Sequence, residues 1–197
     1  MGYCAPLHSK LKFTMKTKRA LIILHPGFEE MEAVAPFDLL ARADIEVSLA
    51  SMTEENFVPG RSNLVFQANH GFKEACAHEL YDAVILPGGP GVKALRQHPE
   101  LCEFLKKHHA AGKILACICA APLLLLDAGL LPDRYTAHPS TSAELVHPEE
   151  SAFVWDGKIL TSQGAGTATE FSLALVEALT DKATRTQIAQ AICWSSK

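Results

Sequence analysis

Residues 114–126 have the sequence ILACICAAPLLLL, and this stretch decides the fold. Residues 113–118 form the most apolar run of the chain, which is typical of a β-strand covered on both faces. Cys119 follows at once, and Pro122 suits the first turn of a helix, where its missing N–H costs little. The stretch therefore predicts a strand, a sharp turn at Cys119 and a helix over residues 121–131.

The same alternation of strand and helix continues on both sides of this unit. Apolar runs predict strands over residues 20–24, 46–51, 64–68 and 83–89, and helical spacing predicts helices over residues 29–43 and 99–109. Residues 163–179 are predicted to form a glycine loop that opens a long helix. Pro36 should bend the first helix or mark a late start, and Thr167 or Thr169 should cap the last one. Asp156 and Gly157 predict a tight hairpin over residues 153–162. The pattern predicts an α/β fold, with a largely parallel sheet, helices on both faces, and ligands beyond the carboxyl ends of the strands.

Composition limits the classes of protein to consider. With 197 residues and 48% hydrophobic content, the chain can bury one core without disulfides, so we expect one domain over residues 18–197 after a loose N-terminal extension over residues 1–17. The net charge is -4, and the lysines and arginines are spread among the acidic residues without forming a basic stripe. This distribution argues against a nucleic-acid partner. No apolar run suits a signal peptide or a membrane span, so we expect a cytoplasmic protein without membrane contact.

Cysteine and histidine spacing gives no metal-ligand pattern. The six cysteines are scattered, and we expect reduced thiols, most of them small buried side chains. Cys117 and Cys119 have no second cysteine or histidine pair at finger-like spacing, and no histidines form an H-x-x-x-H or H-x-H pair. We predict neither a metal nor a cofactor.

Cys119 is the candidate nucleophile. A thiol between a strand and a helix start lies over the positive end of the helix, which should lower its pKa. The motif departs from G-x-S-x-G, because Cys117 and Ala121 occupy the glycine positions, so a buried cysteine at a strand end is the alternative. Gly88 and Gly89 also end a strand, and their N–H groups could hold an oxyanion together with that of Ala120; a plain loop is the alternative.

Two further residues could move protons at this sheet edge. Glu32 lies early in the first predicted helix, where its carboxyl could share a proton with Cys119, although the pattern alone does not say whether Glu29, Glu30 or Glu32 turns inward. His138 follows a short predicted strand and precedes Pro139, and its imidazole could take a proton near neutral pH. A structural histidine is an equally good interpretation of that residue.

Five motifs in order, GFEEMEA, LPGGPG, ILACICAAP, AHP and ILTSQGAGTATEF, resemble the ThiJ/PfpI superfamily. The likeness covers about residues 18–192 and is nearest to the branch of the Parkinson-disease protein and the bacterial YajL-type ThiJ proteins. It implies a flavodoxin-like three-layer sandwich and a homodimer with the first helix near the partner. It also implies that Cys119 is a reactive, easily oxidised cysteine, that Glu32 is the protonated acid beside it, and that His138 is the nearby histidine. The backbone positions for an oxyanion match Gly88, Gly89 and Ala120.

The resemblance implies a cofactor-free, glutathione-independent glyoxalase or protein deglycase that acts on methylglyoxal-like 2-oxoaldehydes or their adducts. A redox-sensing chaperone that works through oxidation of Cys119 is the alternative. An amidase or peptidase is a third possibility, which Ala120 weakens because the protease-like branch has histidine at that position. Gln67 stands where the human-type members have an additional cysteine, so the resemblance implies no redox role at this position. It implies no role for Arg61 either.

Overall fold

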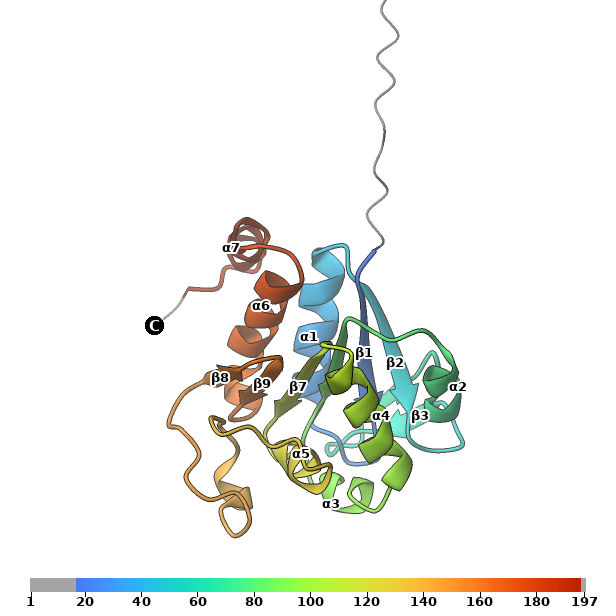
Figure 1. The fold of residues 1–197 in the computed structure, drawn as a ribbon. Helices are drawn as coiled ribbons and strands as arrows, with labels where there is room; N and C mark the ends of the chain where they lie inside the picture. Colours follow the sequence, from blue (N-terminus) through green and yellow to red (C-terminus); the bar gives the residue numbers. More distant parts are fainter. Residues whose placement is uncertain (1–16, 196–197) are drawn as a thin grey trace, which may run out of the picture.

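The structure, a computed structural model, describes residues 17–195 and contains a seven-stranded sheet in the order β5-β2-β1-β6-β7-β9-β8 (Figure 1). Every neighbouring pair is parallel except β8 and β9, which form the predicted antiparallel hairpin. The strands in this order are β5 (His70–Gly71), β2 (Glu46–Ser51), β1 (Arg19–Leu24), β6 (Ala83–Leu86), β7 (Ile114–Ile118), β9 (Ile159–Ser162) and β8 (Phe153–Asp156).

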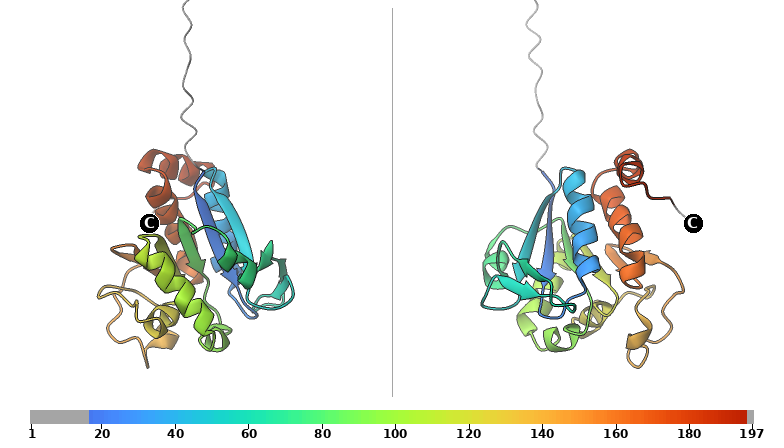
Figure 2. Two further views of the ribbon diagram at one scale, coloured as in Figure 1. Left: turned by 45° about the vertical axis from the view of Figure 1, so that its right-hand side comes forward. Right: turned by 180° about the vertical axis from the view of Figure 1, so that it is seen from behind.

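Helices cover both faces of the sheet, so the predicted three-layer α/β fold is confirmed (Figure 2). One face packs against α1 (Glu30–Arg42), α6 (Ala168–Leu179) and α7 (Lys182–Ala191). The other face packs against α2 (Phe72–Ala77), α3 (Val92–Leu95), α4 (Pro99–Ala110) and α5 (Pro122–Asp127). No helix within residues 17–195 has the length and apolar character needed to cross a membrane.

The two cores explain why the central strands have unbroken apolar sequences. In β1, Ile22 packs into the core beneath α1 and α6, whereas Leu21 and Ile23 pack into the core on the α4 side. Successive side chains of a strand point to opposite faces, so a strand covered on both sides must be apolar at every position. The same holds for β7, which is buried along its whole length.

The segment around Gln67 differs from the prediction. The expected strand over residues 64–68 is shorter, β4 (Val65–Gln67), and it pairs antiparallel with β3 (Phe57–Pro59) in a separate two-stranded sheet. Val65 is exposed, which fits a strand outside the main sheet. The three-residue strands carry too few side chains to reveal their partner from sequence alone.

Helix boundaries also differ from the prediction in places. Pro36 lies inside α1, which begins at Glu30, so it does not mark a late start. Thr167 precedes α6, but its hydroxyl bonds to the backbone of Gly164 and to Ser162 Oγ instead of capping the helix. The sequence patterns predict no helix at the positions of α2, α3 and α7. The expected extension over residues 1–17 lies outside the described residues, except for its last residue.

Candidate active site

A cleft of about 650 Å³ opens beyond the carboxyl ends of β6 and β7, beside the start of α1. Five of the six predicted site residues line it, namely Glu32, Gly89, Cys119, Ala120 and His138. These residues are up to 106 positions apart in the chain. The parallel topology brings them together because the ends of parallel strands meet at one edge of the sheet.

Cys119 adopts a backbone conformation that side chains rarely take. Its φ is 66°, in the left-handed region, directly after the last residue of β7. Its N–H donates to Ser162 O at 2.9 Å, and its carbonyl accepts from His138 N at 2.9 Å. Such a conformation costs roughly 1–3 kcal/mol and persists only where neighbours hold it, which is common at functional sites. The predicted sharp turn is therefore present at Cys119.

Gly88 gives the turn its room. A Cβ atom on Gly88 would lie 2.6 Å from Cys119 Cβ and 2.8 Å from Ala120 N, which is closer than real contacts allow. The end of β6 can thus approach the Cys119 turn only because position 88 has no side chain.

Glu32 is the acid that turns inward. Its side chain is completely buried, and its Oε2 accepts a hydrogen bond from Gly88 N at 2.7 Å. By contrast, Glu29 pairs with Arg61 at 2.8 Å, and Glu30 accepts from Ser62 N at 2.7 Å. Burial raises the pKa of Glu32 from 4.5 to about 7, although the Gly88 hydrogen bond acts in the opposite direction. Glu32 therefore stays protonated at pH values well above those at which a carboxylic acid usually ionises.

The pKa of the Cys119 thiol is raised, whereas the sequence predicts that it is lowered. Burial, followed by the negative charge of Glu32, raises the pKa of Cys119 to about 12, and the N–H groups of Gly89 and Ala120 lower it only in part. The helix that follows has six residues, so its positive end is weak. When Glu32 holds its proton, its charge no longer opposes ionisation of the thiol. Protonation of Glu32 therefore removes one cause of the raised Cys119 pKa, whereas burial, the largest cause, persists.

The three backbone N–H groups of the predicted oxyanion site have two different partners. Those of Gly89 and Ala120 are directed at the Cys119 sulfur, so they can reach an atom bonded to it. That of Gly88 donates to Glu32 and is not available in the same way. Gly88 holds the acid in place, in contrast to the role expected for it.

His138 lies on the solvent side of the cleft and is exposed. Its Nδ1 accepts from Ser140 N at 3.2 Å and lies 2.9 Å from Ser140 Oγ. In the neutral ring the proton is therefore on Nε2. No strand precedes this residue; an irregular segment leads to it, and the hydrogen bond to Cys119 O fixes its backbone.

Sequence reasoning missed the cations of the cleft. Arg61, after β3, lines the cleft and is held by Glu29 at 2.8 Å and by its own N–H to Phe28 O. Arg96 bonds to both Asp127 and Glu144 at the cleft wall. No local pattern around Arg61 indicates its position, because contacts between distant segments create it.

Comparison with known proteins identifies the family of this chain. The model of the DJ-1/PfpI family matches residues 18–178. The chain belongs to the DJ-1/PfpI family. It is 34% identical to Protein DJ-1alpha of Drosophila melanogaster over 91% of this chain and 86% of that protein. It is 31% identical to the glutathione-independent glyoxalase DJR-1.2 of Caenorhabditis elegans, over 82% of this chain and 89% of that protein.

A solved structure supports the same assignment. The crystal structure of Drosophila melanogaster DJ-1beta superposes with a TM-score of 0.85 at 30% identity, covering 92% of this chain and all of that chain. The resemblance to this family and its flavodoxin-like fold, inferred from the five motifs, is thereby confirmed.

The raised pKa of Glu32 predicts how stability changes with pH in this DJ-1/PfpI family member. The folded state binds this proton more tightly than the unfolded state does, so the stabilisation is complete below pH 4.5 and disappears as the pH rises through about 7. Between pH 5 and pH 8 the wild type should lose about 2–3 kcal/mol of unfolding free energy relative to Glu32→Gln, which cannot ionise. Urea unfolding of both proteins at the two pH values measures the difference. Equal losses in the two proteins would show that Glu32 titrates normally.

Proposed function

We propose that this chain is a cysteine-dependent, cofactor-free enzyme of the glyoxalase or deglycase type that acts on methylglyoxal-like 2-oxoaldehydes or their adducts. The observation that carries the proposal is a buried carboxyl with a pKa of about 7 beside a cysteine at a strained turn, both lining one cleft. The family membership and a glyoxalase among the relatives support the reaction type.

The first step joins the substrate to Cys119. The carboxylate form of Glu32 takes the thiol proton of Cys119, and the sulfur adds to the aldehyde carbon, forming a C–S bond while the carbonyl π electrons move to oxygen. The N–H groups of Gly89 and Ala120, which are directed at the sulfur, suit the resulting oxyanion. That oxyanion then takes a proton, which gives a hemithioacetal.

The second step isomerises the hemithioacetal. A base removes the proton from the former aldehyde carbon, and a proton returns to the neighbouring carbon, so the ketone becomes an alcohol and the former aldehyde carbon becomes a thioester. A group with a pKa near 7 can both accept and donate a proton at neutral pH, which suits Glu32. His138, with its proton on Nε2, is the second proton carrier at the cleft.

The third step releases the product. Water attacks the thioester, the C–S bond breaks, and the hydroxy acid leaves as the thiol of Cys119 is regenerated. Over the cycle one water and one methylglyoxal become one lactate, so no external oxidant or reductant is needed. Arg61 lines the cleft and is paired with Glu29, and the N–H groups of its guanidinium suit hydrogen bonds to the carboxylate of the product. The cleft of about 650 Å³ also leaves room for an adduct larger than the free aldehyde.

Lactate production from methylglyoxal without glutathione tests this proposal. Cys119→Ala should abolish turnover, and Glu32→Gln and His138→Ala should each lower it by about 10²- to 10⁴-fold, the usual contribution of a proton-transferring side chain. Cys193→Ala removes an exposed cysteine outside the cleft and should leave turnover unchanged. Full activity in Cys119→Ala would contradict the mechanism.

A redox-sensing chaperone is the second candidate. Hydrogen peroxide would oxidise the thiolate first to sulfenic and then to sulfinic acid, consuming one peroxide and releasing one water at each stage. The same N–H donors and the Glu32 carboxyl would surround the added oxygens. An amidase or peptidase remains the least favoured candidate, because nothing beyond the cysteine and His138 favours it.

Peroxide separates the chaperone from the enzyme. If Cys119 is the sensor, peroxide should add two oxygens to it, measured by intact mass, and should increase suppression of client aggregation in the wild type. Cys119→Ala should not respond, whereas Cys193→Ala should respond normally. Equal suppression by oxidised wild type and Cys119→Ala would exclude a redox role for Cys119.

We also propose a homodimer that works in the cytoplasm. Three apolar side chains of α1 face solvent, namely Met31, Val34 and Phe37, with exposed fractions of 58%, 45% and 39%. A shallow, largely apolar groove lies beside them between α1 and α6. Exposed apolar patches of this kind are typical of subunit interfaces. All five cysteines within the described residues are free, which fits a reducing compartment.

A charge on α1 should disrupt the dimer. Val34→Arg should convert the dimer to a monomer in sedimentation velocity, because it introduces two like charges at a two-fold interface. Val146→Arg is the matched control, since Val146 is 61% exposed but lies in the loop before β8. A dimer that survives Val34→Arg would move the interface elsewhere.

A further inference from the structure

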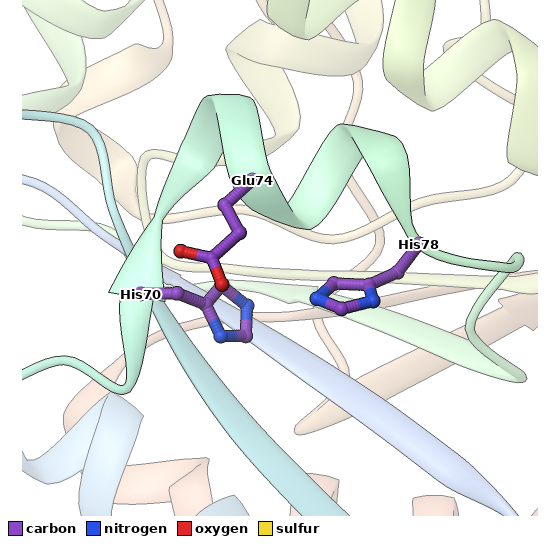
Figure 3. Close-up of side chains that lie close together, drawn as sticks. All are labelled: His70, Glu74 and His78. Atoms are coloured by element: carbon purple, nitrogen blue, oxygen red, sulfur yellow. The ribbon is translucent and has the colours of Figure 1, made fainter.

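A cluster of three potential metal ligands lies at the edge of the sheet that β5 forms, away from Cys119. His70 in β5, Glu74 in α2 and His78 at the end of α2 come together on one side of that helix (Figure 3). One ligand atom from each residue lies within 4.8 Å of the other two. Three strands separate β5 from β7, so this cluster does not belong to the cleft already described.

The local fold determines this arrangement. Residues four apart lie on the same side of a helix, so Glu74 and His78 share one face of α2, while Phe72 and Ala75 are buried on the other. Phe72 contacts Phe104 edge to face, with ring centroids 5.1 Å apart, which fixes α2 against α4. The pairing of β5 with β2 holds His70 beside the start of the helix. The backbone of all three ligands is therefore held by packing unrelated to a metal.

His70 carries a buried polar atom without a partner. Its Nε2 is inaccessible to solvent, and no hydrogen bond reaches it from the described residues. An unsatisfied buried nitrogen is unfavourable, whereas a neutral imidazole nitrogen is among the commonest metal ligands. Its ring lies 5.5 Å from that of His78, centroid to centroid. Arg19, a nearby cation, is paired with Glu46 at 3.5 Å, which offsets its charge.

We propose that His70, Glu74 and His78 bind a Zn²⁺ ion, with a fourth position open to water. Two imidazoles and one carboxylate are a common ligand set for zinc, whereas Mg²⁺ and Ca²⁺ prefer oxygen ligands alone. Ligand atoms around tetrahedral zinc lie about 3.3 Å apart, given bonds of roughly 2.0–2.1 Å. The ligand atoms already lie within 4.8 Å of one another, and Glu74 and His78 are exposed, so modest rotations of their side chains can bring the three atoms to that separation.

This site departs from the sequence-based expectation of no metal. That expectation considered histidines two or four residues apart, whereas His70 and His78 are eight apart with Glu74 midway between them. The wider spacing provides ligands because β5 leads directly into α2. A bound ion would link an edge strand to the helix after it, and it would stabilise the folded state by mass action.

Titration of the full-length, metal-free protein with ZnCl₂ tests the proposal. Calorimetry should give one site per chain, and the melting temperature should rise with zinc concentration. His78→Ala and Glu74→Gln change exposed side chains, so both variants should fold, as circular dichroism can verify. Each should weaken zinc binding at least about tenfold and remove most of the thermal shift. His98→Ala is the matched control, because it removes an exposed histidine 2.9 Å from Glu100 but outside the cluster.

Cobalt identifies the ligand atoms and distinguishes this site from the cysteines. Co²⁺ bound by two imidazoles and a carboxylate should give visible ligand-field bands without a thiolate charge-transfer band, and His78→Ala should remove them. Wild-type affinity for zinc in both His78→Ala and Glu74→Gln would overturn the proposal. A thiolate charge-transfer band that survives in these variants would also overturn it, because the ion would then be at a cysteine. Neither outcome concerns methylglyoxal turnover, so this test is independent of the proposed enzyme.

Discussion

The hydrogen bond from Gly88 N to Glu32 Oε2, 2.7 Å long, is the interaction on which the rest of the site depends. It joins the end of β6 to the first turn of α1 and holds a carboxyl in a fully buried position. Burial makes the charged form of that carboxyl costly, so its pKa rises to about 7 despite the hydrogen bond. An acid of this kind can give and take a proton at neutral pH, beside a cysteine that needs one removed.

The Cys119 turn depends on the same contact region. Because Gly88 has no side chain, β6 and β7 can end close together, and Cys119 can adopt a φ of 66° between them. Hydrogen bonds to Ser162 and from His138 then hold the backbone on both sides. The strain at Cys119 and the burial of Glu32 both oppose stability, and the two helix-covered cores of the sheet offset them. A stable parallel sheet thus supports an unfavourable local arrangement that has chemical use.

The sequence predicts most of the fold because the central strands are apolar at every position and alternate with amphipathic helices. It predicts the turn at Cys119 for the same reason, since strand and helix signals meet there. The sequence alone does not show whether Glu29, Glu30 or Glu32 is buried. That depends on how α1 lies against Gly88, which donates a hydrogen bond to Glu32 although the two residues are 56 positions apart in the chain. The sequence also does not predict that Arg61 lies at the cleft, because contacts between distant segments place it there. It does not predict the cluster of His70, Glu74 and His78, because that cluster depends on the junction between a strand and a helix. The thiol pKa was predicted in the wrong direction because burial and a neighbouring charge outweigh a helix of six residues.

Glu32 holds a proton beside Cys119 at a pH where an ordinary glutamate is ionised. Infrared difference spectroscopy of the wild type against Glu32→Gln observes this proton directly, through the C=O stretching band of a protonated carboxyl. At pH 6 this band should be present in the wild type only, and it should disappear with a midpoint near pH 7. A wild-type spectrum without the band at pH 6 would show that Glu32 is an ionised carboxylate throughout the neutral range and does not hold a proton beside Cys119.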